Sequence, residues 1–360
     1  MHIIQPPADT DRAAVRAAQK QDCEPAPAPA LYSVIVPVYN RPDEMAELLD
    51  SLAQQKGGVA FEILIVEDAA AAPCDKTAAA YADRLAVRYF NVPGTDRSYR
   101  RNYGMQQARG DYFIFFDSDC VIPPHYFASL DGRLRAHYSD CFGGPDAAHE
   151  SFNRVQKAIN YAMTSFFTTG GIRGGGRQME KFKPRTFNMG FSRAVFETVG
   201  GFRDMFGEDI DLSIRIARAG FRTALFREAF VYHKRRVSFK KFFKQIYHFG
   251  IARVNLGIIH KGSLKAVHTF PACCLLGGAA IAALAVGFSY WWLALPAAYV
   301  LLLYCDALYK TGSPATAALA VWASGIQIVA YGWGFLQSFV QKAVFRRGME
   351  DSETLKRIYS

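Results

Sequence analysis

The chain has 360 residues, of which 51% are hydrophobic, and its formal net charge at pH 7 is +10. Since a single hydrophobic core usually stops growing near roughly 250 to 300 residues, this length predicts one large domain and a further segment. The positive charge is concentrated after Ala229, where no acidic residue occurs up to Cys305, and it leads into apolar sequence. No nucleic-acid motif accompanies the charge, so the sequence argues against a nucleic-acid partner and favours membrane lipids.

Residues 1–31 are polar and rich in alanine and proline, which predicts a flexible leader without chemistry of its own. The leader lacks the apolar run of a signal peptide, so we expect the part that follows it to stay in the cytosol. The seven cysteines show no spacing typical of a zinc site, which favours reduced, structural thiols.

From residue 32 onward, short apolar runs alternate with helical patterns. We expect strands at 33–38, 61–66, 85–90 and 112–116 and helices at 43–54 and 99–109. Continuous apolar strands separated by helices indicate an α/β fold with a mostly parallel sheet flanked by helices. Ligands bind beyond the carboxyl ends of such strands, where Tyr39, Asp68 and Asp119 would lie. We expect this domain to extend over residues 32–237.

A basic helical segment is expected after this domain. Residues 238–256 combine phenylalanines with Lys240, Lys241 and Lys244. Such a mixture fits a helix that lies in the headgroup layer of a membrane. We therefore expect a basic interfacial helix region at 238–267.

Three apolar segments follow, at 268–288, 290–308 and 315–340. Each is about as long as the ~20 apolar residues that a spanning helix needs, so 268–341 is expected to hold two to three transmembrane helices before a C-terminal tail at 342–360. Three crossings after a cytosolic start would place Lys342 on the outside, against the positive-inside tendency. Whether one segment is re-entrant or interfacial stays open at this point.

Two carboxylates, Asp117 and Asp119, directly follow the strand-like run 112–116. Carboxylates at positions i and i+2 beyond a strand can hold a divalent cation together, and oxygen ligands suit Mg²⁺ or Mn²⁺. A cation held there can carry a diphosphate group. The pair therefore predicts a metal-dependent site for a phosphorylated ligand.

Three further motifs stand in order around this pair. Pro37-Val38-Tyr39-Asn40 ends the first expected strand, Arg101-Asn102 opens the helix before the acidic pair, and Glu208-Asp209 follows it by about 90 residues. Together the motifs resemble the family 2 glycosyltransferases, in a membrane-anchored bacterial form, over residues 33–233. The resemblance implies a GT-A fold and an inverting transfer of a sugar, of the hexosyltransferase type, from a nucleotide-diphosphate donor.

The resemblance also implies which residues hold the donor. Pro37, Tyr39 and Asp68 match positions that bind the nucleoside. Asp117 matches a position that contacts the ribose or supports the metal, and Arg101 matches one that contacts the diphosphate or braces Asp117. The alternatives are that Asp68 only caps a helix and that Arg101 forms a surface ion pair.

A metal site and a general base are implied as well. Asp119, Asp117 and His233 are the implied ligands of Mn²⁺ or Mg²⁺, and a metal there would stabilise the departing nucleotide. Asp209 is the implied general base, with Glu208 beside it in the same catalytic motif. The alternatives are a purely structural role for His233 and an N-terminal cap by the acidic pair for a helix at 212–219.

Two other classes of protein compete with this interpretation. A nucleotidyltransferase would show a glycine-rich basic loop after the first strand, and residues 38–42 do not form one. A non-catalytic membrane scaffold or accessory subunit that retains the fold would lose its carboxylates, whereas Asp117, Asp119 and Asp209 are present. The scaffold is supported by one departure, because Glu67-Asp68-Ala69-Ala70 stands where the family has Asp-Asp-Gly-Ser.

The run 168–177 is rich in glycine but lacks the residues of a phosphate loop, and we expect it to form a lid over the acceptor site. Arg173 or Arg177 could then meet a phosphate on the acceptor. Because the site is expected beside a bilayer, the acceptor is expected to be a lipid-linked or envelope glycan. The family favours a UDP-sugar as donor, and the expected location is the cytosolic face of a bacterial inner membrane.

Overall fold

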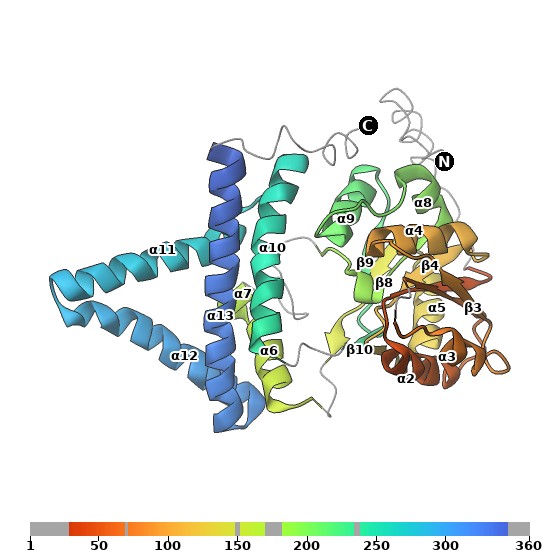
Figure 1. Ribbon diagram of the computed structural model, residues 1–360, viewed down its shortest axis with the longest axis horizontal. Coiled ribbons are helices and arrows are strands. Elements are labelled where there is room, and N and C mark those ends of the chain that lie inside the picture. The colour runs from red at the N-terminus through yellow and green to blue at the C-terminus, as the bar shows by residue number, and fades with distance from the viewer. Residues whose placement is uncertain (1–28, 69–70, 148–151, 170–181, 234–237, 345–360) are drawn as a thin grey trace. The chain divides into compact units, whose positions relative to one another are not determined.

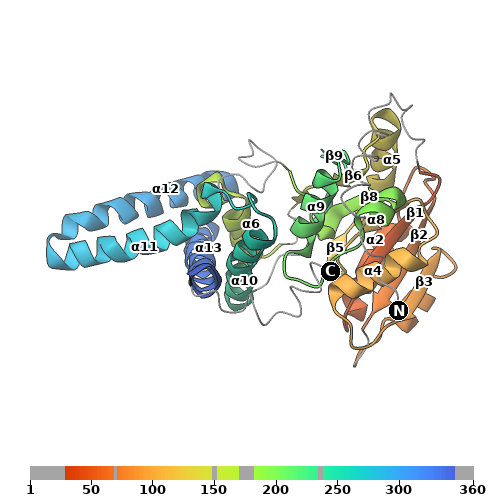
Figure 2. The ribbon, with the colours of Figure 1, turned by 90° about the horizontal axis from the view of Figure 1, so that it is seen from above.

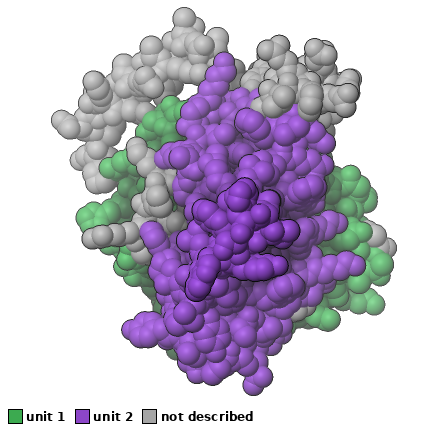
Figure 3. Space-filling model, turned by 90° about the vertical axis from the view of Figure 1, so that its left-hand side faces the viewer, with its two compact units in different colours: residues 1–147, 182–233 green, residues 148–181, 234–360 purple. Residues whose placement is uncertain are grey.

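The computed structural model describes residues 29–68, 71–147, 152–169, 182–233 and 238–344 (Figure 1). Arg173 and Arg177, most of the predicted leader and most of the predicted tail lie outside the described residues. Internal contacts divide the chain into two compact units, which Figure 3 colours separately: residues 1–147 with 182–233, and residues 148–181 with 234–360. This division assigns 148–181 to the second unit, whereas the predicted domain 32–237 included it.

Seven strands among the described residues form the main sheet of the first unit. Their spatial order is β3 (Val87–Asn91), β2 (Phe61–Glu67), β1 (Tyr32–Val38), β4 (Tyr112–Phe115), β8 (Met189–Ser192), β6 (Cys141–Gly143) and β9 (Thr223–Leu225). Strand β1 pairs in parallel with β2 and β4, while β8 is antiparallel to both β4 and β6. The predicted mostly parallel sheet is confirmed.

Helices cover both faces of this sheet because its strands are apolar on both sides. Val34 and Val36 of β1 pack into a core formed with α2 (Pro42–Ala53), α3 (Asp75–Ala79) and α5 (Tyr126–Ala136). Ile35, which points to the other face, joins a core formed with α4 (Arg97–Gln107), α8 (Arg193–Val199) and α9 (Glu208–Arg218). This alternation within a wholly buried strand explains why the sequence shows a continuous apolar run.

A small second sheet lies in the same unit and orders β5 (Cys120–Val121), β10 (Val231–His233) and β7 (Asp146–Ala147). Strand β10 is antiparallel to β5, with His233 opposite Cys120. This pairing brings the end of the first unit next to the acidic pair that follows β4. The sequence analysis did not predict this sheet, because strands of two or three residues leave no periodic pattern.

The second unit is helical in its described part. Its elements are α6 (Arg154–Thr164), α7 (Phe166–Thr169), α10 (Phe239–Ile259), α11 (Ala266–Gly287), η2 (Tyr290–Leu293), α12 (Ala294–Thr311), α13 (Pro314–Phe339) and the π-helical turn η3 (Val340–Val344). Three helices, at Ala266–Gly287, Tyr290–Thr311 and Pro314–Lys342, are long and apolar enough to cross a membrane. Figure 1 shows α10 and α13 side by side and α11 and α12 as a hairpin.

Candidate active site

The carboxyl ends of β1 and β2 carry two of the residues predicted to bind a nucleoside. Tyr39 follows β1 and is 53% exposed, so its ring is available to a ligand. Asp68 follows β2, and its carboxylate accepts a hydrogen bond from the Gly94 amide at 2.9 Å and lies 3.5 Å from the Arg100 guanidinium. Asp68 therefore ties the end of β2 to the segment before α4.

Glu67, the residue that departs from the family motif, is fully buried. Its carboxylate accepts hydrogen bonds from the Cys74 amide at 2.7 Å and from the Tyr89 hydroxyl at 2.9 Å. Burial and this carboxylate raise the pKa of the Cys74 thiol to about 12, so the thiol stays protonated and donates to Glu67 as well. The longer glutamate thus holds the turn after β2 through buried hydrogen bonds.

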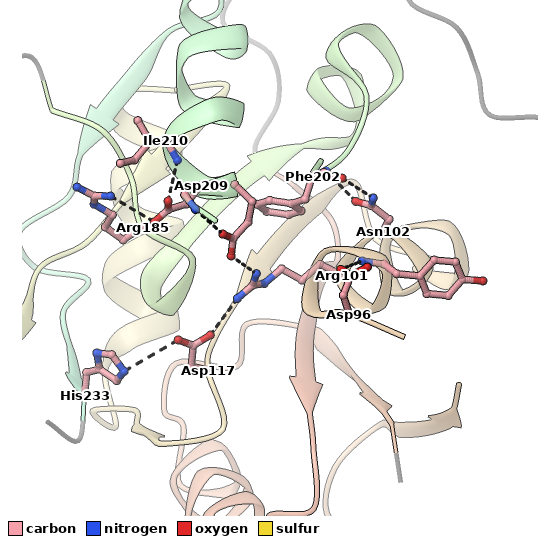
Figure 4. A network of polar contacts seen from close by, with 12 residues as sticks. Asp96, Arg101, Asn102, Asp117, Arg185, Phe202, Asp209, Ile210 and His233 are labelled. Atoms are coloured by element: carbon pink, nitrogen blue, oxygen red, sulfur yellow. Dashed lines mark hydrogen bonds and ion pairs between the residues drawn. The ribbon is translucent and has the colours of Figure 1, made fainter. Parts of the chain in front are cut away.

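The acidic pair after β4 meets a histidine from β10. The His233 Nε2 atom lies 3.1 Å from Asp119 Oδ1. The same atom lies 4.0 Å from Asp117 Oδ2 (Figure 4). The His233 ring also stacks on Phe187, with ring centroids 4.9 Å apart, which fixes the imidazole plane. The three implied metal ligands are therefore brought together by the antiparallel pairing of β10 with β5.

The donor atoms at this place fit a hard divalent cation. The ligand atoms of Asp119, Cys120 and His233 lie within 4.8 Å of one another. Burial, followed by the charges of Asp119 and Asp117, raises the pKa of the Cys120 thiol well above its usual value, and the thiol contacts the Phe187 carbonyl at 3.6 Å. The site therefore offers carboxylate oxygens and an imidazole nitrogen, and the carboxylates suit Mn²⁺ or Mg²⁺.

Arg101 joins the acidic pair to the second acidic motif. Its side chain is completely buried, and one guanidinium nitrogen lies 3.1 Å from Asp117 Oδ1 (Figure 4). Another guanidinium nitrogen lies 2.9 Å from Glu208 Oε1. The guanidinium also lies over the Phe202 ring, 5.4 Å from its centroid. The surface ion pair considered as an alternative is wrong, because Arg101 has no exposed surface. Its predicted contact with a donor stays a prediction.

The segment after Arg101 fixes the approach to α9. Asn102 donates a hydrogen bond to the Phe202 carbonyl and accepts one from the Phe202 amide, both at 2.8 Å. A side-chain amide that pairs with one residue's backbone in both directions holds that residue in a single position. Helix α4 therefore positions both the loop before α9 and, through Arg101, the first residue of α9.

Asp209 lies in the first turn of α9, which begins after Gly207 in a left-handed conformation (φ 91°). One Asp209 carboxylate oxygen lies 3.5 Å from the Arg185 guanidinium, and the other accepts a hydrogen bond from the Ile210 amide at 2.8 Å. The helix expected at 212–219 thus begins four residues earlier, so the acidic pair is inside the helix. The sequence analysis missed Arg185, since no motif includes it.

A cavity of about 200 Å³ adjoins Glu208. Burial and the nearby charge of Asp96 raise the pKa of Asp204 in its wall. The wall combines carboxylates with the exposed ring of Phe206. Its residues are Asp96, Arg97, Ser98, Asp204, Met205, Phe206 and Glu208.

Comparisons with known proteins identify similar sequences and a similar structure. Residues 33–200 match the family model described as Glycosyl transferase family 2. Over 116 residues the chain is 30% identical to the poly(ribitol-phosphate) beta-N-acetylglucosaminyltransferase TarS of Staphylococcus aureus. The aligned residues cover 30% of this chain and 20% of TarS. Over 233 residues it is 28% identical to a validoxylamine A glucosyltransferase of Streptomyces hygroscopicus, covering 55% of this chain and 54% of the relative. The chain thus spans from a fifth to about half of these relatives.

Among solved structures, the mannosyltransferase PcManGT of Pyrobaculum calidifontis, in complex with GDP-Man and Mn²⁺, is similar to this chain with a TM-score of 0.59. The sequences are 18% identical, and the similarity covers 89% of this chain and 94% of PcManGT. At this level of identity the likeness shows a shared fold.

Proposed function

The chain carries a family 2 glycosyltransferase domain, and from this premise we propose that the protein is an inverting glycosyltransferase. It would move a sugar from a nucleotide-diphosphate donor, a UDP-sugar by family habit, to a lipid-linked or envelope glycan. The observation that carries the proposal is the ion-pair chain from Asp117 through Arg101 to Glu208, beside Asp209. These ion pairs would hold the carboxylate proposed for the donor side and the start of α9, which carries the proposed base, on one framework.

Asp119, Asp117 and His233 are the residues that would hold a divalent cation, Mn²⁺ or Mg²⁺. When bound, such a cation supplies a Lewis acid that stabilises negative charge on a departing diphosphate. The residues themselves come from β10 and from the turn after β4, and both are held by backbone pairing. Their positions therefore need no rearrangement of the sheet when a donor binds.

Asp209 would remove the proton from the acceptor hydroxyl while that hydroxyl attacks the anomeric carbon. Its pairing with Arg185 at 3.5 Å holds the carboxylate in one orientation. Glu208 cannot serve as a second nucleophile in this arrangement, because it is buried and bonded to Arg101. One base without a covalent carboxylate nucleophile supports a single displacement, and hence inversion.

The comparisons support a nucleotide-sugar donor. The two relatives, TarS and the validoxylamine A glucosyltransferase, are named for glycosyl transfer, and the PcManGT structure is a complex with GDP-Man. The apolar helices of the second unit support an acceptor at the membrane. We propose that the catalytic unit faces the cytosol of a bacterial inner membrane, where nucleotide-sugars are made.

The direct test is to purify the full chain in detergent and measure nucleotide release from a panel of UDP-sugars and GDP-mannose. The assay contains Mn²⁺ or Mg²⁺ and a membrane lipid extract, and it includes Asp209→Asn and Asp119→Asn. We expect release with one donor and a loss of about 10² to 10³ in rate in both variants. Release that persists in both variants would contradict the assigned roles. Absence of nucleotide binding would favour the non-catalytic scaffold.

A further inference from the structure

Three described helices are apolar enough to cross a membrane, but their surroundings differ. Helices α11 and α12 are joined at their tip by η2 and extend away from the α10–α13 pair (Figures 1 and 2). The apolar windows of these two helices are 17% and 11% buried, whereas that of the third helix is 44% buried. We propose that the α11–α12 hairpin crosses the bilayer and that α13 lies with α10 and α6 in the headgroup layer.

Helix α13 is packed along α10, so the two helices must share one environment. A Cβ atom on Gly250 would meet the Tyr331 carbonyl at 2.3 Å, and one on Gly334 would meet the Tyr247 carbonyl at 2.2 Å. Further along, the Lys342 ammonium donates to Asn255 at 2.7 Å. Backbones this close cannot separate without breaking the bundle, so α13 cannot enter the hydrocarbon without α10.

Helix α10 is unsuited to hydrocarbon. With 21 residues it is long enough to span, yet it is not among the described helices that are sufficiently apolar. Both α10 and α6 carry exposed cations. Each lysine or arginine held near the middle of a bilayer costs about 2.5 to 3.5 kcal/mol. The exposed cations are Lys240, Lys241, Lys244, Arg154 and Lys157.

The tryptophans of α13 indicate a helix in the membrane plane. Trp322 and Trp333 are 63% and 58% exposed and lie eleven residues apart, which is close to three helical turns, so they share one stripe. In a spanning helix over Pro314–Lys342 both rings would lie about 8 Å from the bilayer centre, inside a core about 15 Å in half-thickness. Tryptophan prefers the interface, and a helix in the membrane plane places both rings there.

The hairpin has the features of two crossings. Helix α11 has 22 residues and is therefore about 33 Å long, close to the ~30 Å of a hydrocarbon core. The tip carries Tyr290 and Trp291, which are 78% and 86% exposed and suit the far interface. No lysine or arginine occurs between Lys265 and Lys310, so all basic residues flank the same end of the hairpin.

Polar contacts connect the base of the hairpin to the bundle. Asp306, near the end of α12, accepts a hydrogen bond from the Tyr161 hydroxyl of α6 at 2.6 Å and pairs with Lys310 at 2.9 Å. An acidic residue with these partners belongs at the headgroup level and not in the hydrocarbon. Two crossings therefore return the chain to its starting side, where Lys342 satisfies the positive-inside tendency that three crossings would violate.

Reporter fusions at the C-terminus of the full chain test this topology in bacterial cells. Two crossings predict a fluorescent C-terminal green fluorescent protein and an inactive C-terminal alkaline phosphatase, the same result as for fusions at the N-terminus. Active phosphatase at the C-terminus alone would overturn the proposal, because it would require an odd number of crossings.

A matched pair of lysine substitutions tests which helices meet hydrocarbon. Leu301 in α12 is 62% exposed and Val329 in α13 is 44% exposed, and each lies near the middle of its helix. We expect Leu301→Lys to lower the amount of chain that stays in alkaline-washed membranes at least about tenfold. Val329→Lys should change it less than about twofold, since a lysine in the headgroup layer can extend to water. Equal losses in the two variants, or no loss in either, would overturn the proposal.

Discussion

Arg101 contacts one carboxylate from each half of the candidate site. Asp117 uses one oxygen for Arg101 and turns the other toward His233, while Glu208 holds the start of α9 to the same guanidinium. Because one guanidinium serves two carboxylates, any change at one of them alters how strongly it holds the other. We therefore expect binding on the Asp117 side to depend on the Arg101–Glu208 contact.

The substitution Glu208→Asp tests this dependence without changing the charge. The shorter side chain withdraws from Arg101, which then pairs with Asp117 alone and leaves that carboxylate less available to a cation. We expect the affinity of the full chain for UDP in the presence of Mn²⁺ to fall about fivefold. Isothermal titration calorimetry in detergent measures this affinity without an acceptor.

The matched control is Glu197→Asp, which shortens an exposed glutamate of α8 in the same way. It should leave the affinity unchanged. If Glu208→Asp binds UDP as the unmodified protein does, the coupling through Arg101 is wrong. If the unmodified protein binds no nucleotide, the proposed function is at fault and not the coupling.

Residues that follow a strand were accessible to sequence reasoning, whereas their partners were not. Asp117 and Asp119 were identified because an apolar run predicts where β4 ends. Arg185 comes from a segment without periodicity, and its contact with Asp209 exists because the fold brings a loop to the start of α9. The role of Glu67 was also hidden, since its partners Cys74 and Tyr89 come from later elements.

Among the elements, the α10–α13 pair depends on glycine for its close contact. A Cβ atom at position 250 would lie 2.3 Å from the Tyr331 carbonyl oxygen and 2.7 Å from the Phe335 amide nitrogen. Both obstacles are backbone atoms, which cannot move aside as a flexible side chain can. Small residues at such crossings let helices approach closely and gain packing contacts.

We expect Gly250→Ala to destabilise the second unit by about 1 to 3 kcal/mol, because the helices must separate to admit the methyl group. All four tryptophans belong to this unit, so their fluorescence during a titration with SDS follows its unfolding. Gly277→Ala in α11 is the control, because a Cβ atom there meets nothing within 4 Å. Unfolding of Gly250→Ala at the same SDS concentration as the control would contradict the close-contact argument.

The regular elements followed from periodicity, and the two misses have different causes, one local and one long-range. The strand expected at 85–90 begins at Val87, because the Leu85 amide still bonds to the Tyr81 carbonyl in the preceding turn. Helix α6 was not predicted, although Asn153 and Gln156 form a capping box at its start. Its apolar face packs against α13 from the far end of the chain, a long-range contact that no local pattern contains.

For the molecule as a whole, two kinds of force would hold the chain at a membrane. The α11–α12 hairpin offers exposed apolar surface to hydrocarbon, whereas the bundle of α6, α10 and α13 offers exposed cations to headgroups. The hairpin would keep the protein in the membrane, and the cations would keep the bundle against its surface. The two contributions can be separated, because a change of charge on α10 leaves the hairpin intact.

Replacing Lys240, Lys241 and Lys244 by glutamine should loosen the bundle from anionic lipid while the chain stays in alkaline-washed membranes. Each lysine near an anionic surface contributes about 1 kcal/mol, so the loss is several-fold or more in the population of the docked bundle. Acrylamide quenching of Trp322 and Trp333, read in Trp291→Phe/Trp292→Phe protein in vesicles rich in phosphatidylglycerol, should therefore increase.

The control removes three exposed cations from the first unit by Lys56→Gln, Lys76→Gln and Arg227→Gln. This control has the same net charge as the α10 variant, and its quenching should equal that of the parent protein. Quenching that rises equally in both variants would show an effect of net charge alone. The parent and the α10 variant differ only in the three lysines. If quenching is the same in both, the lysines do not set the position of α13, and packing against the hairpin does.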